Sequence, residues 1–216
     1  AAHGPAPPSP RAPAPHAPPP QAPPPPPCAA PAPRLDRTGK QGLGPAYRAG
    51  SRWATDRGCA ACLEIDADFS HDPADIPRLL ACLNEGADAA IGSRYLDGVR
   101  VINWPEHRLL LSAGASRYVR LCTGLPLTDA TSGFKALRSS ALQAIDRSRL
   151  RADGYGFQIE LHWLLWTAGC RLVEVPIVFT ERRAGQTKMS AGIAVEAAWR
   201  VLQLSLAPRP QPPRES

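Results

Sequence analysis

The sequence predicts an α/β layered domain with a mostly parallel sheet, and two observations support this fold class. Between positions 35 and 206, short apolar runs of strand length alternate with longer segments of helical spacing, as in sheets whose strands are joined by helices. Ahead of them, 16 of the 26 prolines precede Arg34, in a stretch without bulky apolar side chains. We therefore expect a disordered arm over residues 1–34, the domain over 35–206 and a disordered tail over 207–216.

Apolar periodicity and capping signals predict the elements in the first half of the domain. Asp72 and Pro73 form an N-cap and first-turn pair, and Asp75 lies in the same first turn, where a carboxylate is favourable. Short apolar runs indicate the strands. The expected elements are a glycine-rich loop at 39–44, a helix that ends near 58, a strand at 59–65, a helix at 73–84 and a strand at 87–91.

The second half of the domain shows the same alternation. Leucine and other apolar residues recur at helical spacing after Glu106, Gly169 is placed to cap a helix, and β-branched residues follow it. The expected elements are helices at 106–122, 139–145, 157–168 and 189–206, with strands at 134–137 and 171–179.

The charge balance favours an anionic partner. The net charge is +6 and the isoelectric point is near 9.3, which suits nucleotides, phosphates, nucleic acid or a membrane surface. No apolar run approaches the ~20 residues of a membrane-spanning helix, and no nucleic-acid recognition motif is present. We expect no nucleic-acid partner, and a cytoplasmic protein that acts peripherally at the cytoplasmic face of a membrane.

Two carboxylates, Asp66 and Asp68, follow the strand predicted at 59–65. Ligands of open α/β sheets bind at the carboxyl ends of strands. Paired carboxylates at such an end suit a hard divalent cation that also holds a diphosphate. A solvated turn is the alternative for so short a pattern. Asp72 is expected to serve only as a cap, and His71 to be structural.

The segment from Glu64 to Pro73, EIDADFSHDP, closely resembles the acidic signature of dolichol-phosphate mannosyltransferases and related polyprenyl-phosphate glycosyltransferases. The resemblance runs from about residue 35 to 206 and implies a GT-A type fold, the fold of nucleotide-diphospho-sugar transferases. Further segments resemble this family in family order: GKQGLGPAY (39–47), IGSRY (91–95), NWP (103–105), TSGF (131–134), GYGFQIE (154–160), EVPI (174–177) and GQTKM (185–189).

The resemblance implies roles for the acidic turn and for an arginine cluster. Asp66, Ala67 and Asp68 would bind the sugar nucleotide, and Asp66 and Asp68 would hold Mg or Mn, with Ser70 completing the metal shell. Asp68 and Arg94 are the expected catalytic residues. The residues implied to bind the acceptor phosphate are Arg94, Arg108 and Ser112. Without the resemblance, a solvated surface charge would be the simpler reading of any one of these arginines.

Two C-terminal segments allow more than one interpretation. Arg182 and Lys188 bracket a loop that resembles the family's mobile segment over the donor diphosphate, although such a basic loop also suits anionic lipid. The helix at 189–206 has only Glu196 and Arg200 as charges. This helix could pack in the core, or it could lie in the headgroup region of a membrane. A membrane-anchoring partner protein is a further expectation.

The resemblance implies transfer of mannose from GDP-mannose to a polyprenyl phosphate, with inversion at the anomeric carbon. A phosphate monoester has its second pKa near ~6, so the attacking oxygen is already an anion at neutral pH and needs little help from a base. Asp129 is the one candidate base. Transfer of glucose from UDP-glucose, or of another sugar, is the main alternative.

Members of the resembled family begin with two strands that bind the nucleotide base, and no counterpart precedes Leu35 in this sequence. The proline-rich arm stands in their place, and proline removes the backbone donors of a buried strand. We therefore expect an N-terminally incomplete domain that transfers mannose below the usual family rate. A catalytically dead remnant that binds only anionic lipid or a partner is the other expectation.

Overall fold

The computed structural model describes residues 35–36, 39, 42–152, 155–181 and 191–207. The expectations for the arm at 1–34, for Arg182 and Lys188, and for the tail beyond 207 lie outside these residues. The elements in chain order are α1 (Leu43–Asp56), β1 (Ala61–Glu64), η1 (Pro73–Asp75), α2 (Ile76–Asn84), β2 (Ala89–Ser93), β3 (Val101–Ile102), α3 (Glu106–Thr123), β4 (Lys135–Arg138), α4 (Ser139–Ala144), η2 (Arg147–Arg149), α5 (Tyr155–Thr167), β5 (Leu172–Pro176), β6 (Phe179–Thr180) and α6 (Ala191–Ser205).

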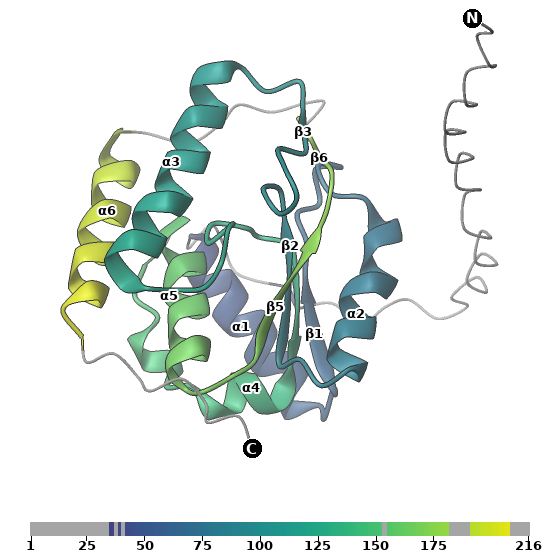
Figure 1. Ribbon diagram of the computed structural model, residues 1–216. Coiled ribbons are helices and arrows are strands. Elements are labelled where there is room, and N and C mark those ends of the chain that lie inside the picture. Colours follow the sequence, from purple (N-terminus) through teal and green to yellow (C-terminus); the bar gives the residue numbers. More distant parts are fainter. Residues whose placement is uncertain (1–34, 37–38, 40–41, 153–154, 182–190, 208–216) are drawn as a thin grey trace, which may run out of the picture. The chain divides into compact units, whose positions relative to one another are not determined.

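Helices and strands alternate as the sequence predicts, so the α/β class is confirmed (Figure 1). Asp72 caps η1 through its side chain, which accepts a hydrogen bond from the Ala74 amide at 2.9 Å. The strand expected at 171–179 is divided into β5 and β6, and the short β3 was not predicted. Pro176 ends β5 in the structure, consistent with its missing backbone donor.

The main sheet has the strand order β1-β4-β2-β5. Strand β2 pairs in parallel with β5, but β4 pairs antiparallel with both β1 and β2. Three of the four strands therefore run in one direction, and β4 runs against them. A separate pair joins β3 to β6 in parallel.

The direction of β4 follows from where its preceding loop is attached. The Gly92 amide donates to the Phe134 carbonyl at 2.8 Å, and the Ser132 hydroxyl donates to the Gly92 carbonyl at 2.6 Å. The chain is thus fixed at the carboxyl end of β2 immediately before β4 begins. Strand β4 must then run back along β2, so the prediction of a mostly parallel sheet missed this reversal.

Two apolar clusters lie on opposite faces of the sheet. Helix α2 covers one face with Leu79 and Leu83, which pack with Ala90 and Val175 of the strands. The other cluster is larger and draws on α3, α4, α5 and α6 (Figure 1). Adjacent residues of β2 alternate between the two clusters, as the two-residue period of a strand requires. The sheet is therefore buried on both faces, and its carboxyl edge is left for a site.

Helix α5 buries a histidine that gives the fold a pH dependence. His162 has no exposed surface, and its Nδ1 lies 3.0 Å from the Ala130 carbonyl oxygen. Burial, together with the Lys135 charge, lowers the pKa of His162 well below its usual 6.5. Below the usual pKa of histidine, His162 of the unfolded chain therefore binds a proton that His162 of the folded chain does not bind.

We expect the free energy of unfolding to fall by about 1.4 kcal/mol from this residue between about pH 7.5 and about pH 5.5. Stability is lost as pH drops, because protonation stabilises only the unfolded state. Urea denaturation at both pH values checks this, and His162→Leu should lack this part of the pH dependence. His107→Leu, at an exposed histidine of α3, is the control. An unchanged pH dependence in His162→Leu would contradict the assignment.

Candidate active site

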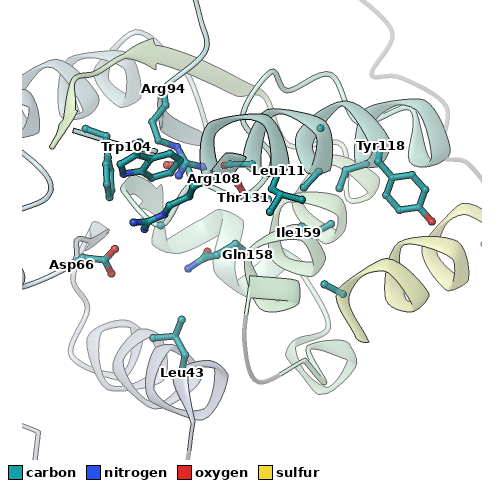
Figure 2. Close-up of a pocket in the computed structure, with 18 of the residues that line it drawn as sticks. Leu43, Asp66, Arg94, Trp104, Arg108, Leu111, Tyr118, Thr131, Gln158 and Ile159 are labelled. Atoms are coloured by element: carbon teal, nitrogen blue, oxygen red, sulfur yellow. Dashed lines mark hydrogen bonds between the residues drawn. The ribbon is translucent and has the colours of Figure 1, made fainter. Parts of the chain in front are cut away.

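A cavity of about 660 Å³ opens at the carboxyl edge of the sheet (Figure 2). Its polar end is formed by Asp66, Asp68, Arg94 and Arg108, and its other end lies between α3 and α6. The apolar end is lined by Leu110, Leu111, Ala115, Tyr118, Val119, Ala197, Ala198 and Val201. One cavity thus joins a charged site to an apolar groove.

The acidic residues lie in a tight turn that begins just after β1. The Asp68 carboxylate accepts hydrogen bonds from the Ser70 amide at 3.1 Å and from the Ser70 hydroxyl at 2.5 Å. Phe69, between them, has a positive φ of 62°, which is uncommon for a residue other than glycine. The turn fixes the Asp68 side chain, and Ala67 lies exposed beside it. Ser70 is buried and acts on Asp68 through its hydroxyl.

His71 supports the second carboxylate of this turn. Its Nε2 lies 3.5 Å from the Asp66 carboxylate. Its ring contacts Phe134 in a tilted arrangement and Phe179 edge to face, at centroid distances of 4.9 and 5.1 Å. The expectation that His71 is structural fits this packing. Its contact with Asp66 was not predicted. The aromatic partners were not predicted either, because they are remote in sequence.

Arg94 lies at the carboxyl end of β2 and forms a buried ion pair with Asp129. Arg94 Nε and Nη2 donate to the two Asp129 oxygens at 2.6 and 2.7 Å, and the Arg94 amide donates to the same carboxylate at 3.0 Å. Nη2 also donates to the Thr131 hydroxyl at 2.8 Å. Both oxygens of Asp129 are thus engaged in orienting Arg94. This geometry does not favour Asp129 as a base.

Arg108 and Ser112 lie one turn apart on α3 and line the same cavity as Arg94. The Arg108 guanidinium lies 4.3 Å from the Trp104 ring centroid, and the Arg94 guanidinium lies 5.5 Å from it (Figure 2). Arg108 Nη1 also donates to both oxygens of Glu181 at 2.5 Å. The structure therefore brings together the three residues predicted to bind a phosphate. The contact with Glu181 was not predicted.

A buried lysine lies beneath the acidic turn. Lys135 of β4 has no exposed surface, and its ammonium lies 3.2 Å from the Glu64 carboxylate at the end of β1. Burial lowers the pKa of Lys135, whereas the Glu64 charge raises it. Lys135 also donates to Gln158 of α5. Sequence reasoning assigned no role to these residues, although Gln158 lies within a family-like segment.

In the part of the chain that the structure describes, no group of three or more histidine, cysteine or acidic side chains is arranged to hold a metal ion. Asp66 and Asp68 are the two acidic residues of this turn that line the cavity. Magnesium is commonly held by one or two carboxylates together with substrate phosphates. The donor set therefore fits a divalent cation whose remaining ligands come from a bound diphosphate.

The groove between α3 and α6 has an exposed apolar border. Leu110 and Leu111 of α3 are 71% and 63% exposed, and Trp199 of α6 is 61% exposed. Val201 faces the core from α6, and Arg200 pairs with Glu160 of α5 at 2.8 Å. Helix α6 thus packs on the core with one face and leaves the other uncovered. Among the described helices, none is long and apolar enough to cross a membrane.

Comparisons with known proteins identify the family of this chain. The family model described as Glycosyl transferase family 2 matches residues 34–146. An undecaprenyl-phosphate mannosyltransferase of Micrococcus luteus is 46% identical over 175 residues, which are 81% of this chain and 72% of the relative. A polyprenol monophosphomannose synthase of Mycolicibacterium smegmatis is 45% identical over 175 residues, 81% of this chain and 66% of the relative. This chain spans only part of each relative's length.

A solved structure supports the fold. Glucosyl-3-phosphoglycerate synthase from Mycobacterium tuberculosis, crystallised with Mn²⁺, UDP-glucose and phosphoglyceric acid, matches with a TM-score of 0.54 at 19% identity. The match covers 78% of this chain and 56% of that chain. At this identity, the likeness concerns the fold alone. The family match and the two mannosyltransferase relatives show that this chain is a glycosyltransferase with a GT-A type fold, and that it belongs to glycosyl transferase family 2.

Proposed function

We propose that this chain transfers mannose from GDP-mannose to a polyprenyl phosphate, with inversion at the anomeric carbon. The observation that carries the proposal is the continuity of one cavity, which joins the acidic turn, two arginines and an apolar groove. A polyprenyl phosphate has the matching chemistry, with a charged head and a long apolar tail. The names of the two mannosyltransferase relatives support the same reaction.

On the donor side, Asp66 and Asp68 would hold Mg or Mn, and Ser70 would keep the Asp68 carboxylate oriented. When bound, the cation would neutralise charge that develops on the leaving diphosphate. The solved neighbour crystallised with Mn²⁺ supports the choice of a divalent cation. Ala67 would approach the sugar nucleotide through its backbone. Arg182 and Lys188 are proposed to contact the diphosphate.

On the acceptor side, Arg94, Arg108 and Ser112 would bind the lipid phosphate. Guanidinium groups suit phosphate oxygens because they present several donors in one plane. Asp129 keeps the Arg94 guanidinium in a fixed orientation, which lowers the cost of ordering this side chain on binding. Arg108 would exchange Glu181 for the phosphate, and no base is required because the phosphate is already ionised.

The prenyl chain would lie in the groove between α3 and α6, and the exposed apolar border of this groove would rest on the membrane. Arg117 and Arg120 are exposed on α3 and would favour anionic headgroups. We therefore propose a peripheral location at the cytoplasmic membrane face. A membrane-anchoring partner protein would add a second attachment.

Replacing Leu110 and Leu111 by serine should weaken binding to vesicles of phosphatidylcholine and phosphatidylglycerol by about tenfold, because two exposed leucines no longer transfer into lipid. Vesicle sedimentation measures this partition. The matched control is Leu80→Ser on α2, which covers the opposite face of the sheet. Equal partition of the double variant and the wild type would contradict the proposed membrane face.

The donor is tested by supplying GDP-mannose or UDP-glucose to the purified protein with a divalent cation and a polyprenyl phosphate. Lipid-soluble sugar should form from GDP-mannose at a rate at least about tenfold above that from UDP-glucose. A preference for UDP-glucose would overturn the proposed sugar. Transfer from neither donor would overturn the proposed reaction.

A further inference from the structure

Gln158 is a buried polar residue in the floor of the cavity. It lies in α5, is 2% exposed and contributes to the cavity lining. Its Oε1 accepts a hydrogen bond from the Lys135 ammonium. An ammonium group can only donate, so Lys135 fixes which end of the Gln158 amide faces it. The Nε2 end must then point away from Lys135.

Lys135 is itself held in place. Its ammonium has no exposed surface and pairs with Glu64, so its contact with Gln158 lies inside the protein and away from water. Glu64 of β1, Lys135 of β4 and Gln158 of α5 thus form a buried polar network beneath the acidic turn. This network fixes the orientation of the Gln158 amide before any ligand binds.

Gln158 Nε2 has no hydrogen-bond partner within the described part of the protein. A buried donor without a partner is costly, and such a group at a cavity wall points to a ligand. The amide is near Tyr47: burial raises the pKa of the Tyr47 phenol, and the Gln158 amide lowers it. The Tyr47 phenol is thus the nearby group that could accept from Nε2, but no contact of Nε2 in the described part of the protein meets the geometry of a hydrogen bond.

Gly133 shows that this donor and the acidic turn face the same space. A β-carbon at position 133 would lie 3.6 and 3.8 Å from the two Asp66 oxygens and 3.9 Å from Gln158 Nε2. Because position 133 has no side chain, this space stays open to a ligand. Figure 2 shows the Asp66 and Gln158 side chains facing this region of the cavity from opposite sides.

We propose that Gln158 Nε2 donates a hydrogen bond to a hydroxyl of the donor sugar, which makes Gln158 a specificity-determining residue. This inference rests on the proposed function. A carboxylate that accepts and an amide that donates, both beside one open space, match the hydroxyl groups of a sugar. Lys135 is a positioning residue, since it orients the amide and touches no ligand.

The test compares kcat/KM for GDP-mannose with that for monodeoxy analogues that each lack one sugar hydroxyl. The wild type should disfavour one analogue by about tenfold to a hundredfold, since that analogue leaves the buried donor unpaired. Gln158→Glu keeps an oxygen for Lys135 but removes the donor. Its kcat/KM for GDP-mannose should fall by a similar factor, and its discrimination against that analogue should shrink to about threefold or less.

Gln143→Glu, at an exposed glutamine of α4, makes the same substitution outside the cavity and should behave as the wild type. If Gln158→Glu does not fold, Gln158→Asn retracts the amide by one methylene and should show the same loss. An active enzyme in which the folded Gln158 variant still rejects the same analogue overturns this inference alone, as does a wild type that accepts every analogue equally. Absence of wild-type transfer overturns the proposed function as well.

Discussion

Asp68→Asn is expected to reduce mannose transfer by about a thousandfold. The substitution keeps the size of the side chain but removes the charge that would hold a divalent cation against the donor diphosphate. Removal of one well-placed electrostatic contact to developing charge commonly costs about a hundredfold to a thousandfold. Initial rates of sugar transfer to polyprenyl phosphate, measured across a range of Mn²⁺ concentrations, give the loss.

Asp72→Asn provides the matched control for this change. Asp72 belongs to the same acidic segment, but its carboxylate accepts from the Ala74 amide and caps η1. Asparagine is an equally good cap, so this variant should keep a rate within about twofold of the wild type. Comparable losses in both variants would show that the segment tolerates no substitution, and full activity in Asp68→Asn would remove Asp68 from the metal site.

Arg94→Met is expected to lower the free energy of unfolding by about 3 to 5 kcal/mol and also to abolish measurable transfer. The Asp129 carboxylate is fully buried and is paired with Arg94 through both oxygens. Loss of the arginine leaves a buried charge without its partner, which is strongly destabilising. Urea denaturation measures the stability, and transfer assays at low temperature measure the activity of the folded fraction.

The double variant Arg94→Met with Asp129→Leu separates these two effects. Removing the stranded carboxylate should recover a large part of the lost stability, because apolar residues can replace a buried ion pair at little cost. It should not recover transfer, since the Arg94 guanidinium is missing and Arg108 alone cannot hold the acceptor phosphate in the same position. Recovery of both properties would reduce Arg94 to a purely structural residue.

Local patterns predicted most of the elements, and tertiary contacts decided what the patterns missed. The Asp72–Pro73 pair marked the start of a helical segment correctly, because capping depends on neighbouring residues alone. The direction of β4 depends on hydrogen bonds that join Gly92 to Ser132 and Phe134. Hydrophobic periodicity does not indicate contacts between residues that are about forty positions apart in the sequence.

Some residues of the candidate site were likewise predicted from the sequence, and others depend on tertiary contacts. Asp66 and Asp68 were predicted because they follow a strand, and ligands bind at the carboxyl ends of strands. Arg94 was predicted from the family resemblance. Gln158 and Glu181 were missed. Gln158 lies within an apolar helix where a polar residue has no periodic signal, and Glu181 reaches Arg108 only through the fold. Buried polar partners of this kind become visible only once the chain is folded.

The product formed from GDP-mannose and a polyprenyl phosphate tests the central claim most directly. The lipid phosphate should attack the anomeric carbon from the face opposite the leaving diphosphate, because the acidic turn is proposed to hold the diphosphate while Arg94 and Arg108, which line the same cavity, bind the lipid phosphate. The one-bond carbon–proton coupling at the anomeric centre, measured by NMR on the purified lipid, should report a β-linked mannosyl phosphate. An α-linked product, or release of free mannose without a lipid product, would contradict the proposed function.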